Sequence, residues 1–267
     1  MKTLLAFFRR DMTVQLSYKF AFAFDVFSVF FSAATFYFVA KLFGQAAIPA
    51  LQRYGGNYFA FVLIGIAFAT YQNVGLNSFS QSLRQEQFLN TLEPLFLTPV
   101  SLPKFLVGAG LWDFFYATLE VVLYLSLGFL LFGLRLPQAN LPAAGMILLL
   151  TLVAFMGLGV LAAAFILRFK RGNPVTWTVA TVSELLGGVY FPTDILPPWL
   201  HSLSVLVPMN HALLGLRKSL LLGAGWSDVG PHALALTVFS VVLWPVGIAA
   251  FSLALKRARK DGSLGHY

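Results

Sequence analysis

The sequence contains no cysteine and has few charged residues. The absence of cysteine excludes disulfide bonds, iron–sulfur clusters and zinc sites with thiolate ligands. Charged side chains make up 10% of the 267 residues, whereas a soluble domain carries about 25%. So few charges cannot cover the surface of a soluble protein of this size. The composition therefore predicts a polytopic membrane protein.

A phosphate-binding loop is also absent. No Gly-x-x-x-x-Gly-Lys-Ser/Thr pattern occurs, so the chain carries no motif of its own for cradling the phosphates of ATP. The histidines lack metal-binding spacing, and polar residues at a membrane interface explain them more simply. We predict no catalytic residue, no metal site and no cofactor in this chain.

Basic residues outnumber acidic residues by 18 to 10, which gives a net charge of +8. They stand mostly at the ends of apolar runs, where membrane topology requires them, so we do not predict a nucleic-acid partner. If both termini are cytoplasmic, most Lys and Arg residues fall in cytoplasmic segments. The positive-inside rule then predicts a multi-pass membrane protein with cytoplasmic N and C termini.

Six apolar segments are predicted to cross the membrane, and the fifth is the shortest. They are residues 20–43, 58–79, 105–132, 141–167, 175–191 and 233–255. About 20 apolar residues cross a hydrocarbon core of about 30 Å. Residues 1–19 place apolar and basic side chains near helical spacing, which predicts an interfacial amphipathic helix. The expected fold is all-α, with one transmembrane domain over residues 1–267.

Two polar stretches interrupt the spans. Residues 84–99 follow the second span and permit a short helix up to about Leu92, which Pro94 would end. We expect that helix to lie on the cytoplasmic side, outside the bilayer. Residues 192–231 are broken by prolines but hold two shorter apolar pieces, which are typical of a re-entrant region. The charge pattern places this second region on the external side.

Five polar side chains lie inside the predicted spans, namely Gln72, Asn73, Asn77, Glu120 and Glu184. A carboxylate that faces lipid costs at least about 2.5 kcal/mol on insertion scales, so these residues should face other helices or a water-filled path. Contact with a cationic or hydroxyl-rich substrate is one explanation. An interhelical hydrogen bond that fixes packing is the other.

Spacing within the spans gives two further expectations. Asp113 and Glu120 are seven residues apart and should therefore share one helix face. Gly159 and Ala163 form a small-xxx-small pattern, which predicts close helix packing in the fourth span.

Two segments resemble the type-2 ABC exporter permeases, which include drug-resistance, polysaccharide and nodulation-factor export permeases. NTLEPLFLTPVS contains Thr91-Leu92-Glu93 and Thr98-Pro99, which is similar to the cytoplasmic signature of that family. GGVYFPTDILPPWLHSLSVLVPMNHALLGLRKSLL, residues 187–221, is similar to the segment after its fifth span. The chain departs from the family at Asn90, where Gly is usual, and at Val207, where Asn often precedes the proline.

The resemblance implies the permease subunit of an ATP-driven exporter that moves a drug, lipid, glycolipid or polysaccharide outward across a prokaryotic plasma (inner) membrane. It implies a homodimer or heterodimer of permeases in membrane lipid, with soluble ATP-binding subunits that hold ATP and Mg²⁺. The residues implied in coupling to those subunits are Arg84, Glu86, Thr91, Glu93, Thr98 and Pro99. The residues implied in an external re-entrant gate are Gly188, Phe191, Pro192, Pro197, Trp199 and Pro208. The path would run along the dimer interface near the second and fifth spans.

An alternative is a protein that uses no ATPase, either a secondary transporter or an intramembrane enzyme that uses Glu120 or Glu184. Secondary transporters often contain repeated or inverted halves. The halves of this chain differ, because one contains the cytoplasmic stretch and the other the external one.

Overall fold

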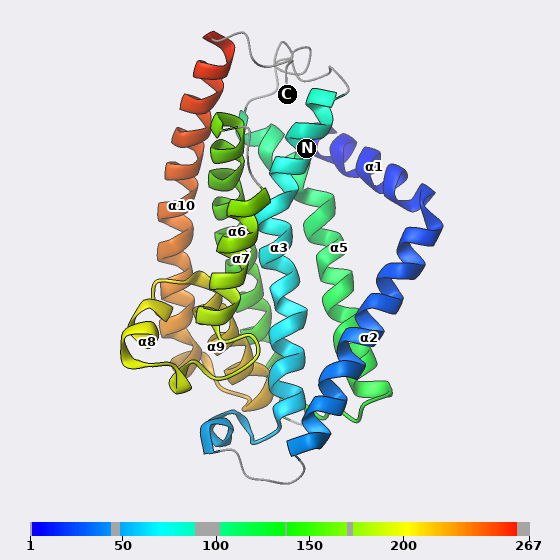
Figure 1. Cartoon of the computed structure of the whole chain (residues 1–267), viewed down its shortest axis with the longest axis vertical. Helices are drawn as coiled ribbons and strands as arrows, with labels where there is room; N and C mark the ends of the chain where they lie inside the picture. The colour runs from blue at the N-terminus through cyan, green and yellow to red at the C-terminus, as the bar shows by residue number, and fades with distance from the viewer. Residues whose placement is uncertain (1, 44–48, 89–101, 137, 170–172, 261–267) are drawn as a thin grey trace.

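The computed structural model describes residues 2–43, 49–88, 102–136, 138–169 and 173–260, and these form helices and connections without a β-strand. The elements are α1 Lys2–Ser17, α2 Lys19–Phe43, η1 Pro49–Tyr54, α3 Tyr58–Phe88, α5 Leu102–Leu130, α6 Leu141–Phe169, α7 Asn173–Gly187, η2 Thr193–Ile195, α8 Pro198–Ser204, α9 Pro208–Leu221 and α10 Trp226–Lys260. Figure 1 shows the long helices side by side, with the N-terminal helix α1 and the C-terminal end of α10 at the same end of the bundle.

Five of the described helices are long and apolar enough to cross a membrane, namely α2, α3, α5, α6 and α10. This confirms the all-α polytopic class. Helix α1 is separate from α2, with Tyr18 between them, and it lies across the end of the bundle. The predicted N-terminal helix is therefore present.

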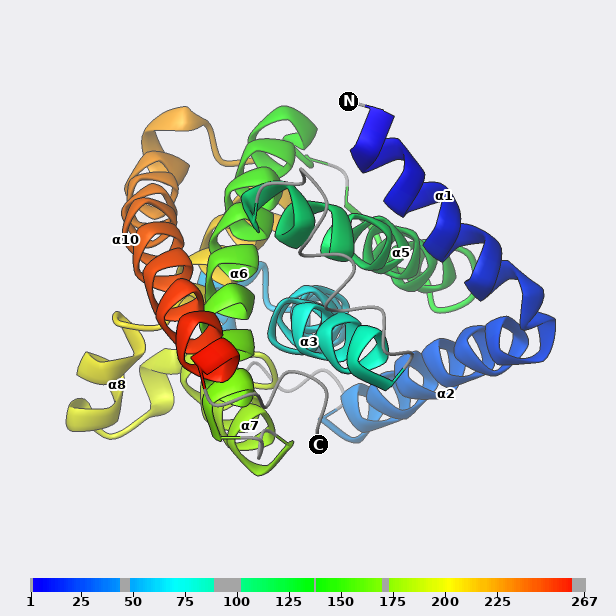
Figure 2. The same cartoon turned by 90° about the horizontal axis from the view of Figure 1, so that it is seen from above.

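Helix α3 is the centre of the bundle. In its most apolar stretch 83% of the residues are buried, compared with 11% in α2, which borders the bundle. Helix α3 packs against α2, α5, α6, α7 and α9 (Figure 2). A helix that is apolar on most of its circumference is expected in such a buried position.

The small residues of α6 allow the closest helix approach, against α3. A Cβ atom placed on Gly159 would collide with the carbonyl oxygen of Gly75. Ala163, one turn later, is fully buried. The predicted small-residue surface of this span is therefore confirmed, because only side chains of this size let the two backbones meet.

The second span and the start of the polar stretch 84–99 form one helix. Helix α3 continues without interruption to Phe88, so Arg84 and Glu86 lie in its last turns. No separate helix begins at Arg84, because no Pro or Gly between residues 80 and 88 breaks α3. Thr91, Glu93, Thr98 and Pro99 lie outside the described residues.

The predicted fifth span is shorter than expected. Helix α7 has 15 residues, about 22 Å at 1.5 Å per residue, which is less than the hydrocarbon thickness. It ends before Gly188, whose positive φ of 72° reverses the chain. Helix α9 packs against α7 and lies toward the other end of the bundle (Figure 1). The chain thus has five long candidate spans among the described residues rather than six.

The region 192–231 does not lie wholly outside the bundle. Helix α9 packs against α3, α6, α7 and α10 and buries most of its side chains. Helix α10 begins at Trp226, earlier than the predicted residue 233. The apolar piece within α9 is in keeping with the predicted re-entrant region, but the burial of the polar residues Asn210, Arg217 and Ser219 was not predicted.

Arg217 explains how α9 can be buried. Its guanidinium donates to three backbone carbonyls: Nη1 to Gly188 at 2.8 Å, Nη2 to Val189 at 3.0 Å, and Nε and Nη2 to Phe61 at 3.2 and 3.0 Å. It also lies 3.4 Å from the centroid of the Phe61 ring. One side chain on α9 therefore holds α3 and the turn that follows α7.

Replacing Arg217 by Met should destabilise the protein by about 3 kcal/mol or more, because three buried carbonyl groups lose charged hydrogen-bond donors. Arg217→Met should therefore lower the midpoint of thermal unfolding in detergent or nanodiscs. Arg135 is exposed, so Arg135→Met is the matched control and should stay within about 0.5 kcal/mol of the native chain. Equal midpoints for the two variants would contradict this role of Arg217.

Candidate functional site

Helix α3 carries a stripe of polar side chains that the bundle does not cover. We call Thr70, Asn73, Asn77, Gln81 and Gln85 the α3 polar stripe. They are spaced three or four residues apart and so share one face. Asn73, Gln81 and Gln85 are exposed and the other two are half-buried, in a helix whose apolar stretch is otherwise mostly buried. The uncovered face of the central helix is thus its polar face.

Glu184 of α7 joins the α3 polar stripe. The Asn73 side-chain amide donates to its Oε1 at 3.4 Å, and the Tyr190 hydroxyl donates to its Oε2 at 3.0 Å. The Asn77 amide donates to the carbonyl oxygen of Asn73 at 2.9 Å. Three of the predicted intramembrane polar residues, Asn73, Asn77 and Glu184, are therefore neighbours at the junction of α3 and α7.

Gln72 points away from this uncovered face. It is fully buried, and its Nε2 donates to the carbonyl oxygen of Ala180 in α7 at 3.2 Å. Its Oε1 has no hydrogen-bond partner among the described residues. Gln72 therefore joins α3 to α7. In this arrangement its side chain does not lie on the uncovered face of α3.

Two carboxylates of α5 face α3, as their spacing predicts. The Ser78 hydroxyl donates to Asp113 at 2.5 Å, and Thr70 hydrogen-bonds to Glu120. Glu120 and Glu184 thus reach neighbouring positions of α3, Thr70 and Asn73, from different helices. An interhelical hydrogen bond is present at each carboxylate, and this bond does not by itself exclude contact with a substrate.

Carboxylates at bilayer depth have hydroxyl and amide partners rather than basic ones. Asp25 of α2 accepts from the Tyr116 hydroxyl at 2.7 Å. Among the described residues, no ion pair involves Asp25, Asp113, Glu120 or Glu184. Three of these carboxylates, Asp113, Glu120 and Glu184, therefore hydrogen-bond to α3 without an ion-pair partner among the described residues.

The C-terminal end of α3 is joined to α1 by an ion pair. Arg10 Nη1 lies 2.6 Å from Oε1 of Glu86, whose side chain is only 7% exposed, and Arg10 Nε lies 2.8 Å from Oδ1 of Asp11. Burial lowers the pKa of Arg10, but the hydrogen bonds and charges of Asp11 and Glu86 outweigh it and raise the pKa overall. Arg10 therefore stays charged. No sequence pattern predicts this pairing across 76 positions.

This ion pair bears on the predicted coupling residues. The carboxylate of Glu86 is directed to α1, so a contact of Glu86 with an ATP-binding subunit stays a prediction. Arg84 is half-buried near the end of α3.

Helix α1 also packs on α5. The ring of Phe8 lies 5.3 Å from that of Trp112, edge to face, and Trp112 Nε1 donates to Gln15 Oε1 at 2.5 Å. A Cβ atom on Gly108 would meet the Phe7 ring at 2.8 Å. Helix α1 therefore contacts both α3 and α5. Through these contacts a displacement of α3 would be passed on to α5, and the reverse.

The predicted gate residues fall in two groups. Gly188, Phe191 and Pro192 form the turn after α7, and the carbonyl of Gly188 is bound by Arg217. Pro197 precedes α8, whose Trp199 is 66% exposed, and Pro208 begins α9 and is buried. Arg217 is the residue that ties this region to the core, and the sequence assigned it no role in the site.

The Arg10–Glu86 pair should be energetically coupled, which a double-mutant cycle of Arg10→Met and Glu86→Gln can measure by chemical or thermal unfolding. We expect about 1–3 kcal/mol, because residues in direct contact couple by about 0.5–3 kcal/mol and Glu86 is buried although Arg10 is not. Arg53 and Asp194 form a more exposed pair at 2.9 Å, so the cycle of Arg53→Met and Asp194→Asn should give less than about 1 kcal/mol. A coupling for Arg10 and Glu86 no larger than this control would refute a structural role of their contact.

Comparison with known proteins gives a consistent result. Residues 3–221 match the family model described as ABC-2 type transporter. The chain is also similar to the inner membrane transport permease YadH of Escherichia coli strain K12, with 28% identity over 225 residues that cover 82% of this chain and 81% of the relative. The YadH proteins of E. coli O157:H7 and Shigella flexneri match equally well. With its five long apolar helices, the chain therefore belongs to the ABC-2 type transporter family and is a membrane permease subunit of an ABC transporter.

Proposed function

We propose that this permease subunit works as one of a pair, and that two ATP-binding subunits drive it to export its substrate. The observation that carries the proposal is the α3 polar stripe with Glu184 beside it. Lipid is an unfavourable neighbour for this face, because a carboxylate at the bilayer centre costs at least about 2.5 kcal/mol on insertion scales. A second permease and a water-filled path between the two would cover it.

Helix α7 fits such an interface. Its exposed apolar side chains include Trp177, Val182 and Leu185, which are 70%, 49% and 41% exposed, and Thr178 and Thr181 are exposed among them. Apolar side chains of this kind bury well against another helix, while the polar residues of α3 stay at the path. Asn73, Asn77 and Glu184 would then line the path, and Gln72 would support it from behind.

The shape of α3 supports the proposed coupling. It is a single helix from the α3 polar stripe to Phe88, so a displacement of its cytoplasmic end would reach the stripe without a hinge. Residues 84–99 would dock on the ATP-binding subunit, with Glu93, Thr91, Thr98 and Pro99 at the contact. ATP and Mg²⁺ would be held by that subunit, because the 267 residues contain no phosphate-binding loop.

The external end would be closed by the turn after α7 together with α8 and α9. Arg217 holds the start of this turn, at Gly188 and Val189, to the core, and Phe191 and Pro192 follow it, whereas the exposed Trp199 on α8 would contact the lipid headgroups. The termini would lie in the cytoplasm of a prokaryotic cell, below the inner membrane. The distribution of Lys and Arg supports this orientation, and the E. coli relative is described as an inner membrane protein.

Reversal of Glu93 should release the ATP-binding subunit. Gentle purification of the tagged chain from its host should yield a stoichiometric soluble ATPase, and Glu93→Lys should lose it because a basic group would replace the acidic partner of the contact. Asp228→Lys, at the start of α10 near the opposite end of the bundle, is the control and should retain it. A native preparation without any ATPase would count against the proposal.

Cross-linking should place α7 at the contact between two copies. The chain has no cysteine, so single cysteines can be introduced without background. We expect Val182→Cys on α7 to form a disulfide-linked dimer in membranes, and Val241→Cys on α10, which is also exposed, to remain monomeric. A dimer that forms through residue 241 and not through residue 182 would overturn this arrangement.

A further inference from the structure

A polar cavity lies between α1, α3 and α5, where the α3 polar stripe reaches the end of the bundle. Its volume is about 540 Å³, within the range of about 300–1,000 Å³ that is usual for sites of small organic molecules. The lining comprises Arg10, Asp11, Val14, Gln15, Tyr18, Gln81, Ser82, Gln85, Glu86, Trp112 and Asp113. Gln81 and Gln85 belong to the stripe, so the cavity adjoins the proposed path.

The lining is acidic, because it contains one basic and three acidic side chains. Arg10 is already bound to Asp11 and Glu86, at 2.8 and 2.6 Å. Asp113 has no basic partner among the described residues, and Ser78 donates to only one of its oxygens. Asp11 is close enough to Asp113 to interact with it as a like charge. The cavity would therefore attract a cation and repel an anion.

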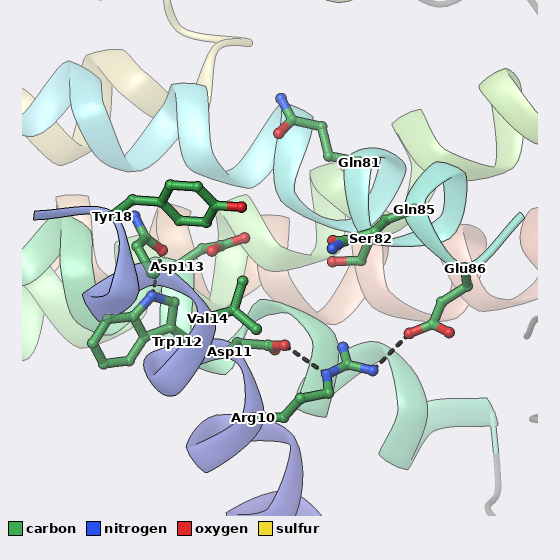
Figure 3. A pocket seen from close by; sticks show the side chains of 11 residues that line it. Arg10, Asp11, Val14, Tyr18, Gln81, Ser82, Gln85, Glu86, Trp112 and Asp113 are labelled. Carbon is green, nitrogen blue, oxygen red and sulfur yellow. Dashed lines mark hydrogen bonds and ion pairs between the residues drawn. The ribbon is translucent and has the colours of Figure 1, made fainter. Parts of the chain in front are cut away.

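Aromatic side chains surround this carboxylate. Figure 3 shows Asp113 between Tyr18 and Trp112 at one end of the cavity, with the Arg10–Glu86 pair at the other end. Gln15 and the Phe8 ring hold the Trp112 indole in place. Tyr18, Trp112 and Asp113 line the same cavity, and aromatic faces together with a carboxylate can bind an organic ammonium group. The described residues contain no group of three potential metal ligands, and the cavity is too large for a bare ion.

We propose that this cavity binds an organic cation, with Asp113 as its counter-ion and Trp112 and Tyr18 as its aromatic wall. A soluble lipophilic amine and the ammonium headgroup of a membrane lipid share this chemistry. That the cation is also the exported substrate rests on the proposed function. It would then meet Glu120 and Glu184 further along α3, which also lack basic partners among the described residues.

The test uses the purified full chain in nanodiscs of phosphatidylglycerol, with radiolabelled tetraphenylphosphonium as the probe and empty nanodiscs as the blank. We expect saturable binding to one site per chain, which the neutral analogue triphenylphosphine oxide does not displace. Asp113→Asn should weaken binding about tenfold or more, because the counter-ion is lost while a polar partner for Ser78 remains.

Two control variants make the result specific. Asp113→Glu keeps the charge and should keep the affinity within about threefold. Asp228→Asn removes a carboxylate outside the cavity and should leave the affinity unchanged. Thermal unfolding of each variant shows whether it is folded. If Asp113→Asn does not fold, Trp112→Phe is tested in its place. This variant has a smaller aromatic ring and should also weaken binding. Equal affinity of the native chain and Asp113→Asn, or displacement by the neutral analogue, would overturn the proposal.

Nanodiscs that contain phosphatidylethanolamine distinguish the two sources of the cation. If a lipid ammonium group occupies the cavity, it will compete and the probe will bind more weakly than in phosphatidylglycerol alone. If the affinity is unchanged, a soluble cation is the occupant. The assay contains no ATP-binding subunit, so a negative result would remove the cation site and leave the permease assignment in place.

Discussion

The contact of Arg217 with three backbone carbonyls is the interaction on which the rest of this structure depends. A charged side chain is seldom buried, because its desolvation must be offset by good hydrogen bonds. Here Phe61, Gly188 and Val189 supply them, from α3 and from the turn that ends α7. Helix α9 can therefore pack inside the bundle although it contains the buried polar residues Asn210, Arg217 and Ser219. It packs beside α7, which is too short to span the whole length of the bundle.

The position of α3 gives the protein a central element with two different faces. Its apolar face and its small residues pack against α6 and the neighbouring helices, and its polar face stays uncovered beside Glu184. Because α3 is continuous to Phe88, the same helix connects the region of the proposed path with the end of the bundle where α1 lies. Arg10, Glu86 and Trp112 tie α1 to this end, and the polar cavity lies among them. The proposed coupling, path and cation site are thus arranged along one helix.

Much of the fold could be predicted from the sequence. The near absence of charge and the length of the apolar runs required a membrane protein with long helices, and the Gly159–Ala163 pattern required close packing of α6. The spacing of Asp113 and Glu120 placed both on one face, which is turned toward α3. Two boundaries were wrong for local reasons. Helix α3 continued because no residue before Phe88 breaks it, and α7 stopped early because Gly188 adopts a positive φ.

The sequence by itself determined the class, the membrane location and the residues that lipid cannot accept, since these follow from composition and helical spacing. Only the tertiary structure decided which side chains from different helices are in contact. Arg10 reaches Glu86 across 76 positions, and Arg217 reaches Phe61 across 156. Asn73 and Glu184 become neighbours although 111 positions separate them, while Gln72, next to Asn73 in the chain, points into the helix contact. Helical spacing fixes directions only within one helix, and how helices rotate against one another depends on packing that involves the whole bundle.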